Sequence, residues 1–411
     1  MRNVFRSTFP STRAGLAALL LVAFTWQCSA ADDLTDEFVR RGQPTVSLKL
    51  SGWISMGVMS WRDGVEHGAA VVDNGEQNSR LKFSAATRFA RDFRAGANIE
   101  LGLSGNFSGA GGIPSTNCID QTSTDCGPLR PIIRTQEIWL QHKRWGKLQL
   151  GTGSPPSRLV KNFAGRIASN QFWGMDSSPQ VGMNLLLRGA SQSIGRLRWR
   201  HLIDGRVGPF REQLAWTSPK IANFTLSFGA GTDDHWDAAI YYANQNLWGF
   251  KVFGAIAFIE DRTPDAGLEF SEIKGSIGAL HNKTGLYAWI ASASRDYPEI
   301  SGFDDPGGRD WYVQAGWKGK PLSLGATAIA IDFGDHANIR AGLSLPGGST
   351  TITGSQTQFF GVGLTQWVNA AALELYVGWR RYDVQSVTVA GGASLTFDDA
   401  DVAIAGARVK F

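Results

Sequence analysis

The chain has 411 residues, of which 49 are glycine and 15 are tryptophan, and only 18% are charged. Beyond residue 30, no stretch approaches the 18 consecutive apolar residues of a membrane helix, so a helical membrane protein is excluded. The formal net charge is +4. Three arginines near the start account for most of this charge, so the composition does not indicate nucleic acid as a partner. The glycines suit tight turns and barrel bends, and the tryptophans suit interfacial belts.

The first 30 residues have the pattern of an export signal. Arg2, Arg6 and Arg13 precede an apolar run that ends at Trp26, and Cys28-Ser29-Ala30 offers a small-residue cleavage site. We predict a cleaved signal peptide over residues 1–30, a short segment over 31–45 and one domain over 46–411. A lipoprotein anchor at Cys28 is the alternative, although the preceding glutamine is a poor neighbour for it.

Segments with a period of two residues recur throughout the rest of the chain. In the first of them, apolar residues such as Leu48, Leu50 and Val58 alternate with polar ones such as Lys49 and Ser55. The pattern predicts about sixteen strands, at 46–61, 79–89, 93–107, 131–144, 146–153, 210–217, 221–231, 235–244, 247–260, 267–281, 284–296, 308–318, 321–335, 355–367, 371–384 and 398–411.

The end of the chain indicates where these strands lie. Val409 and the alanines that share its parity form one face of the last segment, Arg408 and Lys410 form the other, and Phe411 ends it. Short turns alternate with longer loops, as in outer-membrane barrels. We therefore predict an all-β, transmembrane antiparallel barrel in the bacterial outer membrane. A soluble β-sandwich or propeller is the alternative. The export signal and the tryptophans at segment ends favour the barrel (Trp61, Trp145, Trp248, Trp317 and Trp367).

Several phrases resemble Gram-negative porins, and more closely those of alphaproteobacteria. They are Val46–Gly52 with Met56–Trp61, Asn78–Phe83, Gly146–Gly153, Asn223–Phe228 and Ala407–Phe411. The resemblance implies a sixteen-stranded, usually trimeric channel for passive diffusion of small hydrophilic solutes, surrounded by outer-membrane lipid and lipopolysaccharide. It also implies that Phe411 is a signal for the barrel assembly machinery, and that no cofactor is needed.

Strand parity predicts which charged side chains line the pore. Arg80, Lys82 and Arg88 alternate with Leu81 and Phe83, and Arg94 shares a face with Glu100 in the next segment. A cation on the lipid face near the midplane would cost about 2–4 kcal/mol, so these residues are expected to face the lumen.

The longest loop, Ser154–Pro209, follows the fifth predicted strand, where members of the resembled family fold a loop into the channel. It is rich in basic residues and poor in acids. The candidates for the constriction are Arg158, Lys161, Arg166, Asp176, Arg188, Arg196, Arg198 and Arg200. Porins often carry acids on this loop, so the excess of cations predicts a weakly anion-selective or nearly neutral pore. The alternating stretch Arg196–Leu202 is expected to form a hairpin arm inside the loop.

Cys118 and Cys126 are separated by seven residues in a polar loop, and no histidine is near them. In an oxidising compartment this spacing predicts a local disulfide in the second external loop and no metal site.

Two further function classes stay open. Tyr241, Tyr312, Tyr376 and Tyr382 fall on inward parity, which keeps a channel specific for a sugar or an anion as the alternative. An outer-membrane hydrolase or an adhesion barrel is less favoured. The six histidines are scattered, no catalytic or metal motif occurs, and the loops are short for adhesion. The protein is therefore expected not to be an enzyme.

Overall fold

The computed structural model describes residues 46–103, 132–168, 179, 181–189, 197–204, 208–232, 234–262, 269–298, 307–339 and 351–411. The predicted signal peptide and the Cys118–Cys126 disulfide lie outside these ranges. Within them, no helix is long and apolar enough to cross a membrane. The strands are β1 (Ser47–Arg62), β2 (His67–Asp73), β3 (Arg80–Arg88), β4 (Phe93–Gly102), β5 (Ile132–His142), β6 (Gly146–Gly153), β7 (Arg211–Thr217), β8 (Phe224–Gly231), β9 (His235–Leu247), β10 (Phe250–Asp261), β11 (Phe270–His281), β12 (Leu286–Asp296), β13 (Gly308–Leu322), β14 (Gly325–Ala337), β15 (Ile352–Val368), β16 (Leu373–Val389), β17 (Ser394–Leu395) and β18 (Ala400–Lys410).

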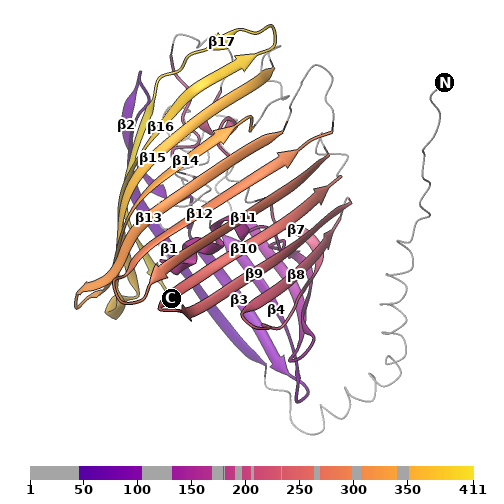
Figure 1. Cartoon of the computed structure of the whole chain (residues 1–411). Helices are drawn as coiled ribbons and strands as arrows, with labels where there is room; N and C mark the ends of the chain where they lie inside the picture. Colours follow the sequence, from indigo (N-terminus) through magenta and orange to yellow (C-terminus); the bar gives the residue numbers. More distant parts are fainter. Residues whose placement is uncertain are drawn as a thin grey trace, which may run out of the picture.

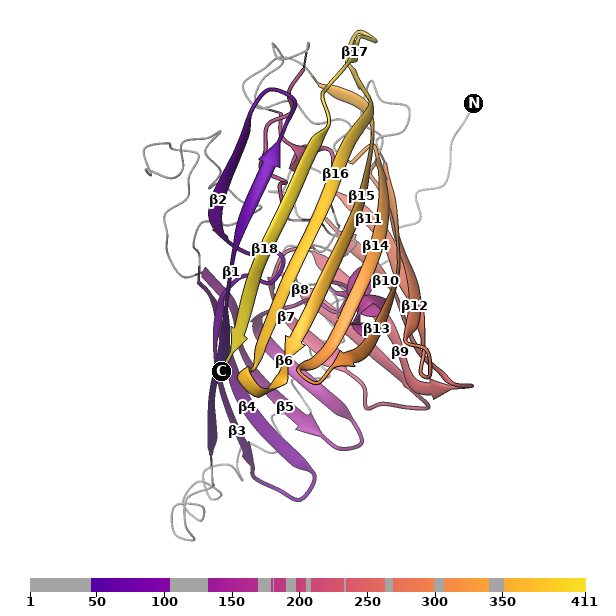
Figure 2. The same cartoon turned by 90° about the vertical axis from the view of Figure 1, so that its left-hand side faces the viewer.

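These strands form one antiparallel sheet that closes on itself (Figure 1). Closure comes from β1 and β18, which pair from Trp53 opposite Lys410 to Arg62 opposite Asp401. Two strands share the other edge of β1. β2 runs beside its upper part and β3 beside its lower part (Figure 2). β2 and β3 together occupy one strand position of the barrel, and β17 is only two residues long and does not count as a barrel strand. The barrel therefore has sixteen strands, as predicted. β2 and β17 were not predicted.

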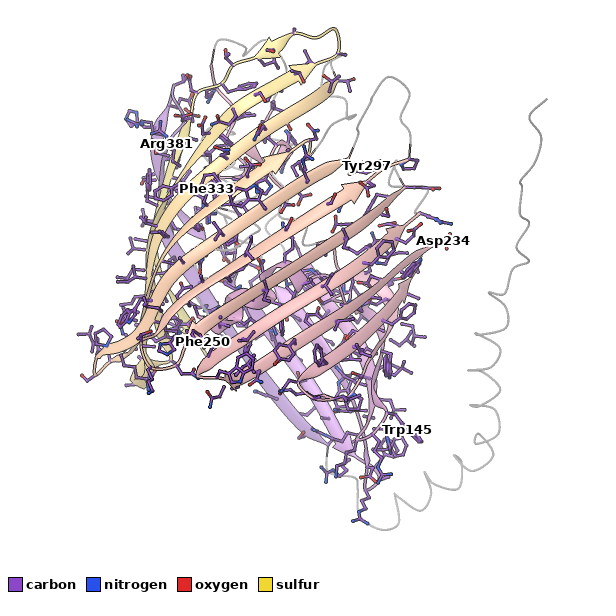
Figure 3. All side chains as sticks on the ribbon, viewed as in Figure 1. Trp145, Asp234, Phe250, Tyr297, Phe333 and Arg381 are labelled. Atoms are coloured by element: carbon purple, nitrogen blue, oxygen red, sulfur yellow. The ribbon has the colours of Figure 1, made fainter. Side chains whose placement is uncertain are left out.

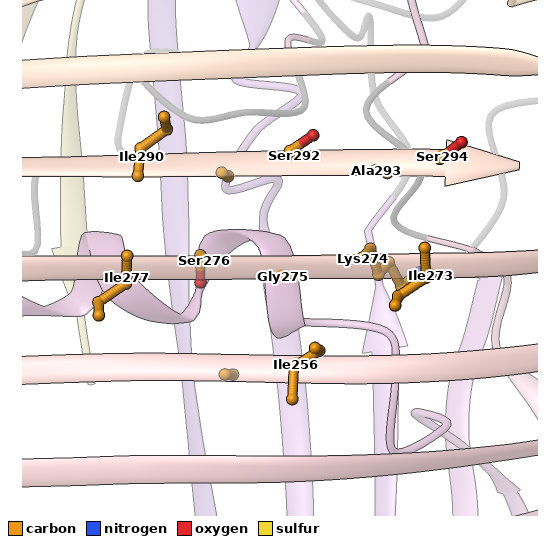
Figure 4. Close-up of a pocket in the computed structure, with 12 residues that line it drawn as sticks. Ile256, Ile273, Lys274, Gly275, Ser276, Ile277, Ile290, Ser292, Ala293 and Ser294 are labelled. Carbon is orange, nitrogen blue, oxygen red and sulfur yellow. The ribbon is translucent and has the colours of Figure 1, made fainter.

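Side chains alternate between the lipid face and the lumen along each strand. On β11, Ile273 and Ile277 are more than half exposed, whereas Lys274 and Ser276 between them are buried on the inner face. Figure 4 shows this part of the wall, where isoleucines surround a shallow hollow over Gly275 and a short helix lies on the far side of the strands. The predicted parity of the first strand also holds, because Leu48, Leu50 and Val58 are exposed.

Aromatic residues gather towards both ends of the outer face. Trp145 and Phe250 lie near the end with the short turns, and Phe333 lies nearer the opposite end (Figure 3). Trp145 is 67% exposed and Trp248 is 88% exposed, as expected for rings at a membrane interface. Trp61 departs from the predicted belt. It lies on the inner face of β1 and is only 5% exposed, because apolar groups inside the barrel cover it.

Several inward-facing aromatic rings pack closely against a glycine of the neighbouring strand. A Cβ atom on Gly334 would approach the Phe359 ring to 2.2 Å, and one on Gly316 would approach Tyr287 Oη to 2.6 Å. Gly334 and Phe359 are direct partners in the β14–β15 register. Part of the high glycine content therefore makes room for rings that cross to the adjacent strand.

The replacement Gly334→Ala is expected to destabilise the barrel by about 1–3 kcal/mol, because the added methyl group must displace the buried Phe359 ring. The temperature at which the folded form loses its fast migration on unheated electrophoresis should fall. Gly254→Ala is the matched control, since its Cβ would meet its nearest neighbour at an ordinary 3.4 Å. Equal melting of the two variants would contradict this account of the glycines.

Candidate functional site: the lumen and its basic belt

The long loop between β6 and β7 enters the barrel, as the sequence suggested. It begins with the short helix α3 (Val160–Phe163) and the 3-10 turn η2 (Ala164–Ile167), which pack on β10, β11 and β12. The hydroxyl of Ser276 on β11 donates to the Val160 carbonyl, and the Ala164 amide donates back to the same hydroxyl at 3.2 Å. The Phe163 ring lies 4.8 Å from that of Tyr241. These contacts fix the start of the loop against one wall.

The later part of the loop forms a hairpin inside the lumen. The Leu187 amide donates to the Leu197 carbonyl at 2.9 Å, and the Trp199 amide donates to the Leu185 carbonyl at 3.2 Å. An antiparallel bridge joins Leu186 to Arg198, so the predicted hairpin arm is confirmed at Leu197 and Arg198, but not beyond them. A 3-10 turn, η3 (Trp199–His201), follows the second arm.

This hairpin buries an apolar surface against the barrel wall. The Trp199 ring packs 5.5 Å from the ring of Tyr382, whose hydroxyl donates to the Val181 carbonyl at 2.7 Å. Wall and loop together form one apolar core. It includes Met59, Trp61, Val72, Met183, Leu185, Leu197, Trp199, Leu202, Phe359, Val387, Val402 and Ile404. One side of the lumen is therefore filled with packed side chains rather than water.

Three of the predicted constriction cations fasten the loop and do not face open water. Lys161 is 1% exposed and forms an ion pair with the fully buried carboxylate of Asp310 on β13. Arg188 bonds to Asp63 at 3.0 Å and to Glu66 at 2.9 Å, both in the turn after β1. Arg198 is also buried and donates to the Asn184 carbonyl at 2.5 Å. Their charges therefore contribute less to the pore than a count of loop residues suggests.

The other predicted loop residues differ from one another. Arg166 and Arg200 are exposed. The Arg158 guanidinium donates to the Gly208 carbonyl at 3.2 Å, which ties the start of the loop to its end. Asp176 and Arg196 lie outside the described ranges.

The four inward tyrosines support the structure. The Tyr241 hydroxyl donates to the Pro156 carbonyl, and the Tyr312 hydroxyl donates to Asp332 at 3.0 Å. Tyr376 bonds to the Met56 carbonyl at 3.2 Å, and Tyr382 holds the hairpin as described above. Because Tyr312 and Tyr382 are fully buried, they do not form an aromatic path for a solute.

A cluster of cations lies on the inner face of β3, β4 and β5. Glu100 on β4 accepts from Arg80 at 3.0 Å and from Lys82 at 2.7 Å, both on β3. It also accepts from Arg134 on β5 at 3.0 Å. One carboxylate thus lies among three cations, which leaves a local excess of positive charge.

The cluster continues across the β1–β18 pairing that closes the barrel. On β18, Arg408 and Lys410 pair with Glu374 on β16, and the second contact is 2.5 Å long. Trp53 on β1, the strand between β3 and β18, contacts both groups. Arg80 is 5.0 Å from the centre of its ring, and Arg408 is 5.5 Å from it. Cation–π attraction helps to hold these like charges side by side.

The cluster also reaches the loop. Phe210 lies between two guanidinium groups, with Arg134 at 4.6 Å and Arg158 at 4.0 Å from its ring centre. Burial, together with Arg134 and Arg80, lowers the pKa of Arg158. We call this set the basic belt. It consists of Arg80, Lys82, Arg134, Arg158, Arg408 and Lys410, with Glu100, Glu374, Trp53 and Phe210.

Two predicted wall residues stand apart from the belt. Arg88 and Arg94 face each other in the register at the end of the β3–β4 hairpin, and both are exposed. Sequence reasoning missed the belt residues Arg134, Trp53, Phe210 and Glu374. For Arg408 and Lys410 it recognised only the water-facing side of the last strand. Among the described residues, no three His, Cys, Asp or Glu side chains gather in a way that could hold a metal ion.

The replacement Lys161→Met is expected to loosen the loop, because it leaves Asp310 buried without its cation, at a cost of about 3–5 kcal/mol. Single-channel recordings should show larger current fluctuations, and the barrel should unfold at lower urea concentration. The double variant Lys161→Met with Asp310→Leu should recover part of the stability, since both charges are then gone. A double variant as unstable as the two single changes combined would argue against this ion pair.

Comparison with known proteins places the chain in a family. The family model described as Gram-negative porin matches residues 15–409. No curated protein matches the sequence. Among solved structures, the anion-selective porin from Comamonas acidovorans aligns with a TM-score of 0.57 and 12% identity, over 89% of this chain and 100% of that one. The trimer form of OmpT from Vibrio cholerae aligns at 0.53 and 9%, over 89% and 100%. OmpF of Salmonella typhi in complex with daunomycin aligns at 0.53 and 12%, over 89% and 97%.

The match to the family model covers nearly the whole chain, and the fold agrees with it. The chain therefore belongs to the Gram-negative porin family, and it is an outer-membrane diffusion channel.

Proposed function

We propose that the channel passes small hydrophilic solutes and weakly prefers anions. The observation that carries this proposal is the basic belt, in which six cations surround two carboxylates on the inner face of the barrel. Cations from both the wall and the loop contribute to it. Such a ring raises the local concentration of anions and opposes cations. No catalytic step, cofactor or metal is part of the proposal.

The preference is expected to be weak for two reasons. Glu100 and Glu374 offset part of the charge, and salt in the pore screens the rest. At physiological ionic strength the Debye length is about 8 Å, so the field fades within the width of a narrow pore. The preference should therefore strengthen in dilute salt. The Comamonas porin is named anion-selective. The similarity of that structure supports only the fold of this chain. The basic belt is the separate reason for expecting an anion preference here.

Replacing Arg80 and Lys82 together with glutamine is expected to shift the zero-current potential in a dilute KCl gradient towards cation preference. The variant removes two belt charges and keeps polar side chains on the wall. The matched control is Arg88→Gln with Arg94→Gln, which removes the same charge from the same face at the hairpin end. A large cation preference of the wild type, or equal shifts in both variants, would refute the assigned role of the belt.

We further propose that three copies assemble and that Phe411 assists insertion by the barrel assembly machinery into a membrane of outer-membrane lipid and lipopolysaccharide. Phe411 exchanges two backbone hydrogen bonds with Gly52, at 2.9 and 3.1 Å, while 58% of its surface is exposed. The ring is thus available to a partner even though the backbone is already paired. A trimer form is described for the Vibrio protein.

Deleting Phe411 is expected to reduce the amount of trimer in the outer membrane several-fold. Full burial of one Phe side chain contributes only about 1.5–3 kcal/mol to the free energy of folding. The purified variant should therefore still refold in detergent. Unheated electrophoresis of outer-membrane fractions measures the first effect, and refolding yield measures the second. Normal membrane levels of the variant would remove the assigned role of Phe411.

A further inference from the structure

The strand position that β2 and β3 share is interrupted by an insertion, which is separate from the long loop. β2 ends at Asp73, opposite Met56, and β3 begins at Arg80, opposite Trp53. Between them, residues 74–79 leave the sheet, and we call this segment the inserted turn. Asn74, Glu76, Asn78 and Ser79 are buried. Because the turn contacts inward-facing belt residues, it projects into the lumen.

Hydrogen bonds to both flanking strands hold the inserted turn in one conformation. The Ser55 amide donates to Ser79 Oγ at 3.0 Å, and the Ser79 amide donates to the Asp73 carboxylate at 3.0 and 3.3 Å. The Asn74 amide donates to the Ser55 carbonyl at 3.1 Å. Asn74 Oδ1 then accepts from the Glu76 amide at 3.0 Å, closing an Asx turn. The inserted turn, which interrupts the strand between β2 and β3, therefore has a defined conformation.

The inserted turn contacts the basic belt directly. The Trp53 indole donates to the Gln77 and Asn78 carbonyls, at 3.2 and 2.9 Å. Asn78 Oδ1 accepts from Arg80 at 3.2 and 3.4 Å. Gln77 Oε1 accepts from Arg408 at 3.2 Å. Both acceptors are neutral amide oxygens, so they orient two guanidinium groups without cancelling their charge.

We propose that the inserted turn is a second constriction element, placed on the wall side of the pore, and that Gln77 and Asn78 are positioning residues for Arg408 and Arg80. The turn narrows the lumen beside the basic belt. It also presents two oriented guanidinium groups to small hydrated anions. The second effect rests on the proposed anion preference, whereas the first does not.

The test uses Gln77→Cys in the full-length protein, because Gln77 is only half-buried. Purified channels in a planar bilayer are exposed to an anionic and then, separately, to a cationic methanethiosulfonate reagent. Both reagents should lower the single-channel conductance in discrete steps, since each adds bulk to the constriction. The anionic adduct should also shift the zero-current potential towards cations, and the cationic adduct should shift it towards anions.

Two controls accompany this variant. Gln356→Cys places the same change on an exposed, lipid-side position of β15 and should be modified without loss of conductance. The wild type shows any effect of its own cysteines. If mass spectrometry shows that Gln77→Cys is modified while its conductance is unchanged, the inserted turn does not limit the pore.

A further variant covers the case in which the cysteine variant does not assemble. Gln77→Glu keeps the shape and places a carboxylate beside Arg408, so it should shift the zero-current potential towards cations. An unchanged potential would overturn the positioning role. A wild type without anion preference would refute the proposed function alone, because the loss of conductance on modification would still support the second constriction.

Discussion

The pairing of β1 with β18 is the interaction on which the rest of this protein depends. Within a bilayer, each unpaired backbone amide or carbonyl costs several kcal/mol, so a sheet can cross only when it has no edge. The register from Trp53 to Arg62 removes that edge, and the bonds between Gly52 and Phe411 complete it at the last residue. Once the sheet is closed, its inner face is shielded from lipid and can carry the charges that its outer face excludes.

The inner face carries two unlike clusters. The apolar core draws on β1, β2 and β11 to β18, and the loop contributes Trp199 and its neighbours to it. The basic belt lies along β16, β18, β1 and β3 to β5, so the two clusters share strands but use different residues of them. Buried pairs such as Lys161 with Asp310 hold the loop against the wall, and Arg158 at the start of the loop joins the basic belt through Phe210. The loop thus links the two clusters.

Strand number and parity could be predicted because lipid and water impose opposite demands on alternate residues. β2 was not predicted because its residues do not alternate between apolar and polar. Ala69, Ala70, Val71 and Val72 are apolar on both faces, with lipid on one side and the apolar core on the other. Lys161 and Arg188 could not be assigned, because their acidic partners come from distant strands and turns. Arg80 and Lys82 followed from parity, whereas joining them to Arg408 needed the closure of the barrel.

The apolar core has an effect on ions that never touch it. Packed hydrocarbon polarises far less than water, so the field of the basic belt spreads poorly into the apolar core and is concentrated in the water beside the belt. Each guanidinium therefore acts more strongly on a passing ion than it would in a barrel filled with water. We therefore expect residues such as Leu185 and Val402, which carry no charge and lie in the apolar core, to influence the permeability of the channel to ions.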